Sequence, residues 1–144
     1  MLTYDLDLSL RDATALRSKE HLFLLTDTNA KQHCLPLVIK SIDISNDHIL
    51  TLPAGDANKN LESVQKVWDF LFANGATRNS LLLNLGGGMI CDLGGFAAST
   101  YMRGMEFVNI PTTLLADVDA ANGGKVGVNY HGMKNAIGAF SQPK

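Results

Sequence analysis

The sequence predicts an α/β domain of the doubly wound, Rossmann-like class, with a parallel sheet and helices on both faces. Short apolar runs typical of buried strands alternate with segments in which apolar residues recur every three or four positions, as they do on helices. A composition of 46% hydrophobic and 18% charged residues over a length of 144 is that of a globular domain. Strands that alternate with helices imply βαβ units and therefore a parallel sheet.

The first half of the chain contains the less regular elements. Apolar and polar residues alternate over 3–10, which is typical of a half-exposed strand, whereas 22–25 and 48–52 are apolar runs typical of buried strands. Residues 30–35 are expected to form a short helix, which ends there because Pro36 cannot sit comfortably inside a helix.

The middle of the chain has clearer boundaries. A helix is expected to begin after the Asn60 cap, to carry apolar residues every three or four positions, and to end at Gly75, the usual left-handed stop. A strand at 80–85 then runs directly into three glycines, and a helix follows at 89–101. This strand, glycine turn and helix form the most informative junction of the sequence.

The last elements are a strand at 107–110 and a helical segment over 114–118, which the glycines at 123–124 break. Beyond that point we expect loops. Lys125 and Lys134 stand beside glycines at irregular spacing, which is more typical of anion-binding loops than of a solvated helix face.

Composition also excludes several classes of function. Twelve basic and fourteen acidic residues give a net charge of −2, so no basic surface for nucleic acid or for an anionic membrane is expected. Asp5 and Asp7 interrupt the apolar N-terminal stretch, which is therefore not a signal peptide. Cys34 and Cys91 are not paired as CxxC and indicate reduced thiols in a cytoplasmic protein. The four histidines show no metal-ligand spacing, so no metal site is expected in this chain.

The glycines at 86–88 indicate an anion-binding turn. They allow backbone N–H groups to approach a ligand, and the helix that opens there presents unpaired amides to a pyrophosphate. The strict GxGxxG pattern fails, since Cys91 occupies its third place, and a turn that is merely tight remains an alternative. Asp92 is expected in the first turn, where the helix dipole favours a carboxylate with or without a ligand. Cys91 is either an activated thiol or, as we favour, a small filler.

Polar residues also follow the two earlier strands. Asp27 and Asn29 end one of them, and Asp56 and Lys59 follow the next. In doubly wound folds such strand ends line the ligand crevice, where an acidic group commonly binds ribose hydroxyls, although each residue alone is equally well explained as a turn or cap. A third set of polar residues suggests a phosphorylated or carboxylated substrate and consists of Arg103, Asp119, Lys125, Lys134 and Asn135.

The chain from residue 86 onward resembles the 3-dehydroquinate synthase family. The matching motifs stand in that family's order and spacing: GGGMICDLGGF at 86–96, YMRG at 101–104, IPTTLLA at 110–116, GGK at 123–125, GMKN at 132–135 and IGAF at 137–140. TDTN at 26–29, and PAGD at 53–56 with Lys59, extend the match more loosely. The resemblance covers 27–143, most of the chain.

This resemblance implies a domain organisation and a reaction. Residues 1–144 would be the N-terminal NAD-binding α/β domain of a longer two-domain enzyme, and the family's C-terminal helical metal-binding domain is absent. The parent enzyme would be a phosphate-eliminating carbon–oxygen lyase of the shikimate pathway. It would convert 3-deoxy-D-arabino-heptulosonate 7-phosphate to 3-dehydroquinate and phosphate, using NAD catalytically and a divalent metal, zinc or cobalt, whose ligands lie beyond this chain. The fragment alone is expected to be inactive, and the parent is expected to be a cytoplasmic homodimer.

The resemblance also implies roles for individual residues. The expected contacts to NAD are Asp27, Asn29, Asp56 and Lys59 at the adenosine, and Gly87, Gly88, Asp92, Thr112, Thr113 and Lys134 along the pyrophosphate and the nicotinamide half. The expected catalytic and substrate-binding residues are Asp119, Lys125, Lys134, Asn135 and Arg103. Arg103 matches an arginine that reaches the substrate phosphate of the neighbouring subunit.

Three departures from the family pattern leave the family resemblance intact but bear on the exact reaction. Asp56 replaces a usual glutamate, Cys91 replaces a glycine, and 120–122 with Val126 lack the usual hydroxyls. The alternatives are therefore another sugar-phosphate cyclase, of the inosose or valiolone type, and a non-catalytic NAD-binding module. A polyol dehydrogenase shares the fold but should lack Arg103 and the Lys134–Asn135 pair, since it has no phosphate to bind.

Overall fold

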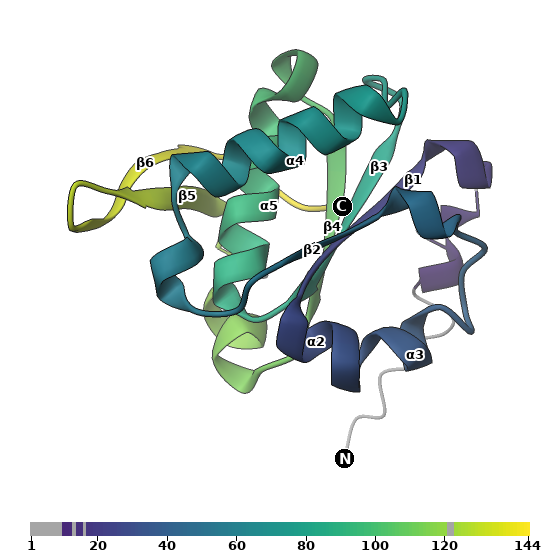
Figure 1. Cartoon of the computed structure of the whole chain (residues 1–144), viewed down its shortest axis with the longest axis horizontal. Helices are drawn as coiled ribbons and strands as arrows, with labels where there is room; N and C mark the ends of the chain where they lie inside the picture. Colours follow the sequence, from purple (N-terminus) through teal and green to yellow (C-terminus); the bar gives the residue numbers. More distant parts are fainter. Residues whose placement is uncertain (1–9, 13, 16, 121–122) are drawn as a thin grey trace.

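A computed structural model describes residues 10–12, 14–15, 17–120 and 123–144 of the chain (Figure 1). The strand expected at 3–10 lies outside the described residues except for Leu10, which is helical. No helix in the described part is long and apolar enough to cross a membrane.

A four-stranded parallel sheet forms the centre of the fold. Its strands, in the spatial order β2-β1-β3-β4, are β2 (Ile49–Leu52), β1 (Leu22–Asp27), β3 (Leu81–Gly86) and β4 (Glu106–Pro111). Every neighbouring pair is parallel, so the carboxyl ends of all four strands lie at one edge. The predicted fold class is confirmed, and this edge is where doubly wound folds bind ligands.

Helices cover both faces of the sheet (Figure 1). They are α2 (Thr28–His33), α3 (Leu35–Val38), α4 (Leu61–Ala73) and α5 (Gly88–Thr100), with short helical turns η1 (Lys19–His21), η2 (Asn46–His48), η3 (Asp56–Asn58), η4 (Tyr101–Arg103) and η5 (Ala116–Ala120). The Asn60 side chain accepts a hydrogen bond from the Ser63 backbone N–H, and Gly75 follows α4 with φ 72°, as the sequence predicted for this helix.

The expectation of one helix over 30–35 is wrong. Asp27 caps α2 by accepting hydrogen bonds from two backbone N–H groups, so that helix begins at Thr28. Pro36 lies in the first turn of a second helix, α3, rather than ending the first. A proline is tolerated in a first turn because its missing N–H would have no helical partner there.

The loops expected after residue 124 are also wrong. The chain forms an antiparallel hairpin of β5 (Lys125–Tyr130) and β6 (Met133–Phe140), which projects from the body of the molecule (Figure 1). Gly127 pairs with Gly138, and a Cβ on either would collide with the backbone of the opposite strand. Val126 packs against Gly95 of α5, so the hairpin is fixed to the helix that follows the glycine turn.

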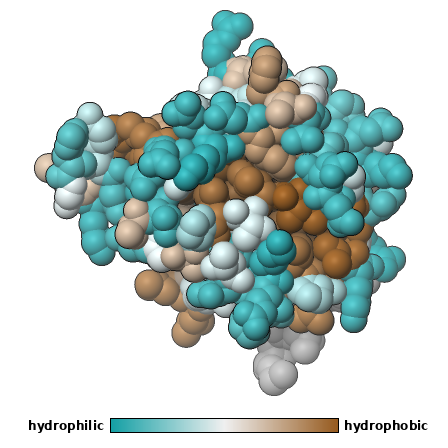
Figure 2. Space-filling model, viewed as in Figure 1, coloured by the Kyte–Doolittle hydropathy of each residue, from teal (hydrophilic) through white to brown (hydrophobic). Residues whose placement is uncertain are grey.

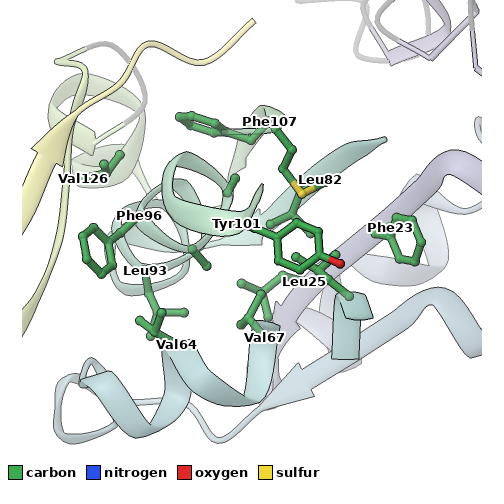
Figure 3. Packing of buried hydrophobic residues seen from close by; sticks show 14 of the residues in the cluster. Phe23, Leu25, Val64, Val67, Leu82, Leu93, Phe96, Tyr101, Phe107 and Val126 are labelled. Carbon is green, nitrogen blue, oxygen red and sulfur yellow. The ribbon is translucent and has the colours of Figure 1, made fainter. Parts of the chain in front are cut away.

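The two faces of the sheet carry separate hydrophobic cores. Alternate residues of a strand point to opposite faces, so Leu82 of β3 joins the cluster under α4 and α5, shown with Phe23 and Leu25 of β1 in Figure 3. Leu81 and Leu83 join the cluster under α2 and α3. On the face shown in Figure 2, hydrophobic surface gathers at the centre and hydrophilic side chains surround it.

Asn84 is a fully buried polar side chain between β3 and α5. Its Nδ2 donates a hydrogen bond of 3.0 Å to Asn109 Oδ1 of the neighbouring strand. Its Oδ1 faces Gly94 of α5, where the absence of a Cβ leaves the space that the amide fills. The close contact sets how near α5 lies to the sheet.

Gly94→Ala is therefore expected to destabilise the protein by about 1–3 kcal/mol, because its Cβ would overlap the Asn84 amide in a packed core. Gly87→Ala is the matched control, since a Cβ there meets only Thr113 at 3.5 Å, an ordinary contact. Equilibrium urea unfolding measures both. Equal stability of the two variants would show that Asn84 does not set the position of α5.

Candidate functional site

A cavity of about 730 Å³ opens between the N-terminus of α5, η5 and the β5–β6 hairpin, within the range typical of ligand pockets. Its polar lining residues include Asp56, Lys59, Asp92, Lys125 and Asn135, all of which the sequence singled out. The fold therefore brings together side chains as far apart in the sequence as Asp56 and Asn135. The cavity is the candidate functional site.

The N-terminus of α5 supplies an anion-binding wall. Gly87 is the N-cap, in an extended conformation and without a side chain that caps the helix, so the first backbone N–H groups have no helical partner. Gly88 and Met89 line the cavity. At Gly86 a Cβ would lie 2.7 Å from Ile90 Cβ and 3.1 Å from Asp27 Oδ2, so this turn requires glycine. Bare amides at a helix N-terminus favour a phosphate or pyrophosphate.

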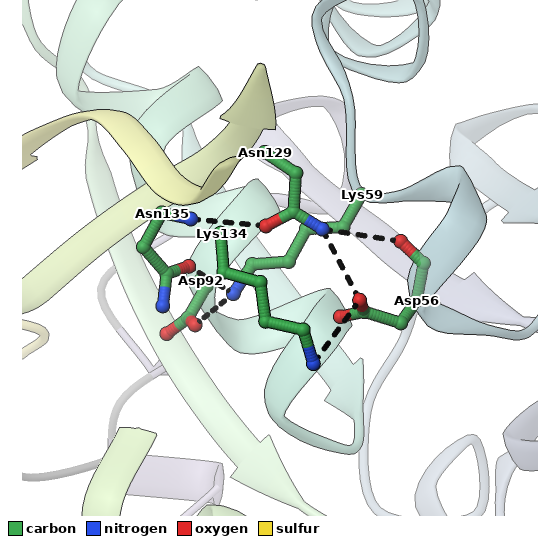
Figure 4. Close-up of polar contacts among 6 residues, drawn as sticks. All are labelled: Asp56, Lys59, Asp92, Asn129, Lys134 and Asn135. Carbon is green, nitrogen blue, oxygen red and sulfur yellow. Dashed lines mark hydrogen bonds and ion pairs between the residues drawn. The ribbon is translucent and has the colours of Figure 1, made fainter. Parts of the chain in front are cut away.

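Lys59 is the buried cation of the site. Its side chain follows η3, and its Nζ lies 2.5 Å from Asp92 Oδ2 and 2.6 Å from Asn135 Oδ1 (Figure 4). Only 7% of the Lys59 side chain is exposed. Asp92 is the fifth residue of α5 and not in its first turn as expected, and its carboxylate pairs with Lys59. The ion pair joins the loop after β2 to helix α5, and the hydrogen bond to Asn135 joins the same loop to the hairpin.

A second, exposed set of contacts surrounds Asp56. Asn129 Nδ2 donates to Asp56 Oδ2 at 3.2 Å, and Lys134 Nζ lies 3.7 Å from the same oxygen (Figure 4). Asn129 Oδ1 in turn accepts a hydrogen bond of 3.0 Å from the backbone N–H of Asn135. Sequence reasoning missed Asn129. Its place on β5 could have pointed to this residue, but the sequence analysis expected loops there and not a strand.

The residues at the ends of β1 and β4 lie at the same edge of the sheet. Asp27 Oδ1 accepts from the Asn29 backbone N–H at 2.8 Å, which makes Asp27 a helix cap, while its Oδ2 faces Gly86. The Thr112 backbone N–H donates to the Gly86 carbonyl at 2.9 Å, and Thr113 lies against Gly87. The glycine turn is thus held between the strand ends on either side of it.

Of the expected site residues, Arg103 is not brought into this arrangement, and the Asp119 side chain is not described. Arg103 is exposed in η4, beyond the C-terminal end of α5, and a helix of 13 residues separates it from the cavity by about 20 Å. Asp119 belongs to η5, but its side chain lies outside the part of the chain that the structure describes. Lys125 is exposed and lines the cavity.

Cys91 is not an activated thiol. Its side chain is fully buried, and burial, with a smaller contribution from Asp92, raises its pKa to about 12. A thiol that stays protonated at neutral pH is a poor nucleophile, which leaves the small-filler interpretation. Among the described residues, no group of three His, Cys, Asp or Glu side chains would hold a metal ion.

Comparison with known proteins finds close relatives. The family described as 3-dehydroquinate synthase N-terminal matches residues 49–144. A 3-dehydroquinate synthase of Parabacteroides distasonis is 50% identical over 96% of this chain and 39% of its own length. One from Pyrococcus furiosus is 45% identical over 96% of this chain and 41% of its own. The chain thus spans about two fifths of the length of the curated relatives it matches.

Solved structures share the fold. A 2-deoxy-scyllo-inosose synthase, complexed with carbaglucose-6-phosphate, NAD+ and Co2+, matches 94% of this chain and 39% of its own with a TM-score of 0.81 at 24% identity. A 2-epi-5-epi-valiolone synthase from Streptomyces hygroscopicus, with NAD+ and Zn2+ bound, matches 93% of this chain and 38% of its own at 0.77 and 30% identity.

Lys59→Ala is expected to destabilise the protein by about 3 kcal/mol, because it leaves the Asp92 carboxylate half-buried without its cation. Lys66→Ala is the matched control, since Lys66 pairs with Glu62 on the exposed surface of α4, where an ion pair contributes about 0.5 kcal/mol. Urea unfolding measures the free energy of unfolding of both variants. A similar decrease in the two would show that the Lys59–Asp92 ion pair is no stronger than one on the surface.

Proposed function

This chain belongs to the 3-dehydroquinate synthase family, and from that premise we propose that the whole protein converts 3-deoxy-D-arabino-heptulosonate 7-phosphate to 3-dehydroquinate and phosphate. We propose that residues 1–144 are its N-terminal NAD-binding domain, which the match to only 39% of a relative's length supports. The observation that carries the proposal is the cavity in which the bare N-terminus of α5 lies beside Lys125 and the buried Lys59. The two free thiols suit a cytoplasmic protein.

The residues at the cavity suit NAD. The backbone amides at Gly87 and Gly88 would hold its pyrophosphate, and the Asp56 carboxylate would accept a hydrogen bond from a ribose hydroxyl. Asp27, Thr112 and Thr113 lie beside the same glycine turn, which supports their assignment to the cofactor, and we assign Asn29 with them because its backbone N–H donates to Asp27. When bound, NAD would take a hydride from an alcohol carbon of the substrate and later return it, and the ketone present in between makes the neighbouring C–H acidic, so that phosphate can leave.

The hairpin would provide the substrate side of the cavity. Lys125 and Lys134 are exposed cations on β5 and β6, and an ammonium group binds phosphate or carboxylate as a point charge. Asn135 lines the cavity and would add a neutral hydrogen-bonding group. We assign Asp119 to the same side because η5 forms another wall. The role of these residues is to orient the substrate against the cofactor and to neutralise its charge.

Arg103 would serve a second subunit. It cannot reach the cavity of its own chain across the length of α5, and its exposed side chain is accessible to a neighbouring subunit. A guanidinium group there would bind the phosphate of a substrate held in the partner's cavity. This assignment requires a homodimer.

The part of the chain that the structure describes offers no site for the metal that the family would use. No group of three potential ligand side chains occurs among the described residues, so no step of the reaction is assigned to a metal here. We propose that its ligands belong to the rest of a longer protein. Residues 1–144 by themselves would then bind the cofactor but have no catalytic activity.

The other sugar-phosphate cyclases are less favoured than 3-dehydroquinate synthase. Identity reaches 50% with a 3-dehydroquinate synthase but 30% with the valiolone synthase. A glycerol dehydrogenase from Schizosaccharomyces pombe shares the fold at only 15% identity, with a TM-score of 0.63. The chain also has Arg103 and the Lys134–Asn135 pair, which a polyol dehydrogenase should lack because it has no phosphate to bind.

The full-length protein, supplied with NAD and a divalent metal, is expected to release phosphate from 3-deoxy-D-arabino-heptulosonate 7-phosphate. Glucose 6-phosphate is the matched comparison, as the oxygen counterpart of the carbaglucose-6-phosphate bound to the inosose synthase. A phosphate-release assay with both sugars decides the substrate. Turnover of glucose 6-phosphate alone would contradict the proposal and favour an inosose-type cyclase.

Arg103→Ala is expected to raise KM for the sugar phosphate strongly and to leave NAD affinity and thermal stability nearly unchanged, since Arg103 is exposed and far from the glycine turn. Mixing it with a Lys125→Ala protein should partly restore activity, because one site of each heterodimer keeps both residues. If the subunits exchange and no activity returns, Arg103 does not act across the dimer.

A further inference from the structure

We propose that Asn129 is a positioning residue of the cofactor site. Its side chain holds Asp56, in the loop after β2, and Asn135, on β6, in fixed positions relative to each other. The proposal rests on the proposed function, because Asp56 and Asn135 are assigned to ligand binding only there. Asn129 stands on β5 and is not among the residues that line the cavity of the candidate site, so it would act there through its neighbours.

Every polar group that the Asn129 side chain offers is used. Its Nδ2 donates to the Asp56 carboxylate at 3.2 Å and to the Asp56 carbonyl at 3.4 Å. Its Oδ1 accepts from the Asn135 backbone N–H at 3.0 Å, and its own backbone N–H donates 2.9 Å to the Lys59 carbonyl. One residue therefore links the loop after β2 to both strands of the hairpin (Figure 4).

The chemistry requires an amide at this position. The Asp56 carboxylate needs a donor and the Asn135 N–H needs an acceptor, and a carboxamide supplies both on one short side chain. Aspartate would keep the acceptor but place an anion against Asp56, whereas an aliphatic side chain would supply neither. Asn135 also adopts φ 52°, a left-handed conformation that a hydrogen bond to its N–H helps to fix.

The consequence for binding is preorganisation. The Asp56 side chain is 58% exposed, and its ion pair with Lys134 is long at 3.7 Å, so the Asn129 amide is its shortest contact among the residues of the hairpin. A carboxylate already oriented when the cofactor arrives loses less rotational freedom on binding. Asn135, held by Asn129 at its backbone and by Lys59 at its side chain, is fixed in the same way.

The test uses the full-length protein and NAD as the probe, with calorimetry for Kd and thermal unfolding for stability. Asn129→Ala is expected to weaken NAD binding about tenfold and to leave the melting temperature nearly unchanged. Asn74→Ala is the matched control, since its Nδ2 donates to the Phe70 carbonyl at the far end of α4, and it should leave Kd unchanged. Equal Kd for wild type and Asn129→Ala overturns the inference. Failure of the wild type to bind NAD instead overturns the proposed function, and this inference with it.

A double-mutant cycle separates positioning from a general loss of packing. If Asn129 acts through Asp56, adding Asn129→Ala to Asp56→Ala should weaken NAD binding little further. The isosteric Asn129→Asp should weaken it more than Asn129→Ala, and adding Asp56→Asn should recover part of that loss, because the amide and the carboxylate have then exchanged places. The proposal is contradicted if the two alanine substitutions weaken NAD binding by independent factors that multiply in the double variant. It is also contradicted if the Asn129→Asp, Asp56→Asn double variant recovers no NAD affinity.

Discussion

The geometry of the cavity depends on the contacts that the Lys59 ammonium group makes with Asp92 and Asn135. This ammonium group is almost fully buried and lies within 2.6 Å of both Asp92 and Asn135. A buried cation is unfavourable unless it is paired and hydrogen-bonded, so the loop after β2 is stable in this position only when α5 and the hairpin both contribute an oxygen. Because the three elements meet at one charge, they define the cavity together.

Close packing of small residues makes that meeting possible. Gly94 lets α5 approach the buried Asn84 amide, and Gly95 lets Val126 of the hairpin approach the same helix. Once α5 lies this near to the sheet and to the hairpin, its N-terminus opens into the cavity and Asp92 reaches Lys59. The proposed cofactor site is thus a consequence of where one helix is held, and its bare amides need no side chain of their own.

Local patterns predicted the parallel sheet, the helix that Asn60 caps and the glycine turn, because each depends on residues that are neighbours in sequence. The hairpin was not predictable in this way: β6 is almost wholly exposed, and its pairing depends on Gly127 meeting Gly138 across eleven positions. The same limit hid Asn129 and the burial of Lys59. Lys59 was identified as a site residue, but its partner Asn135 is 76 positions away, so its environment follows only from the fold.

Amide hydrogen exchange in the Lys59→Met protein tests most directly whether this one charge holds the hairpin against α5. The backbone N–H groups of Asn129 and Asn135 are hydrogen-bonded to the Lys59 carbonyl and to the Asn129 side chain, so they report on the position of the hairpin. If the charge holds it, both should exchange faster than in the wild type, while the amides of β1 and β3 keep their protection. Unchanged exchange at Asn129 and Asn135 would contradict that role for Lys59.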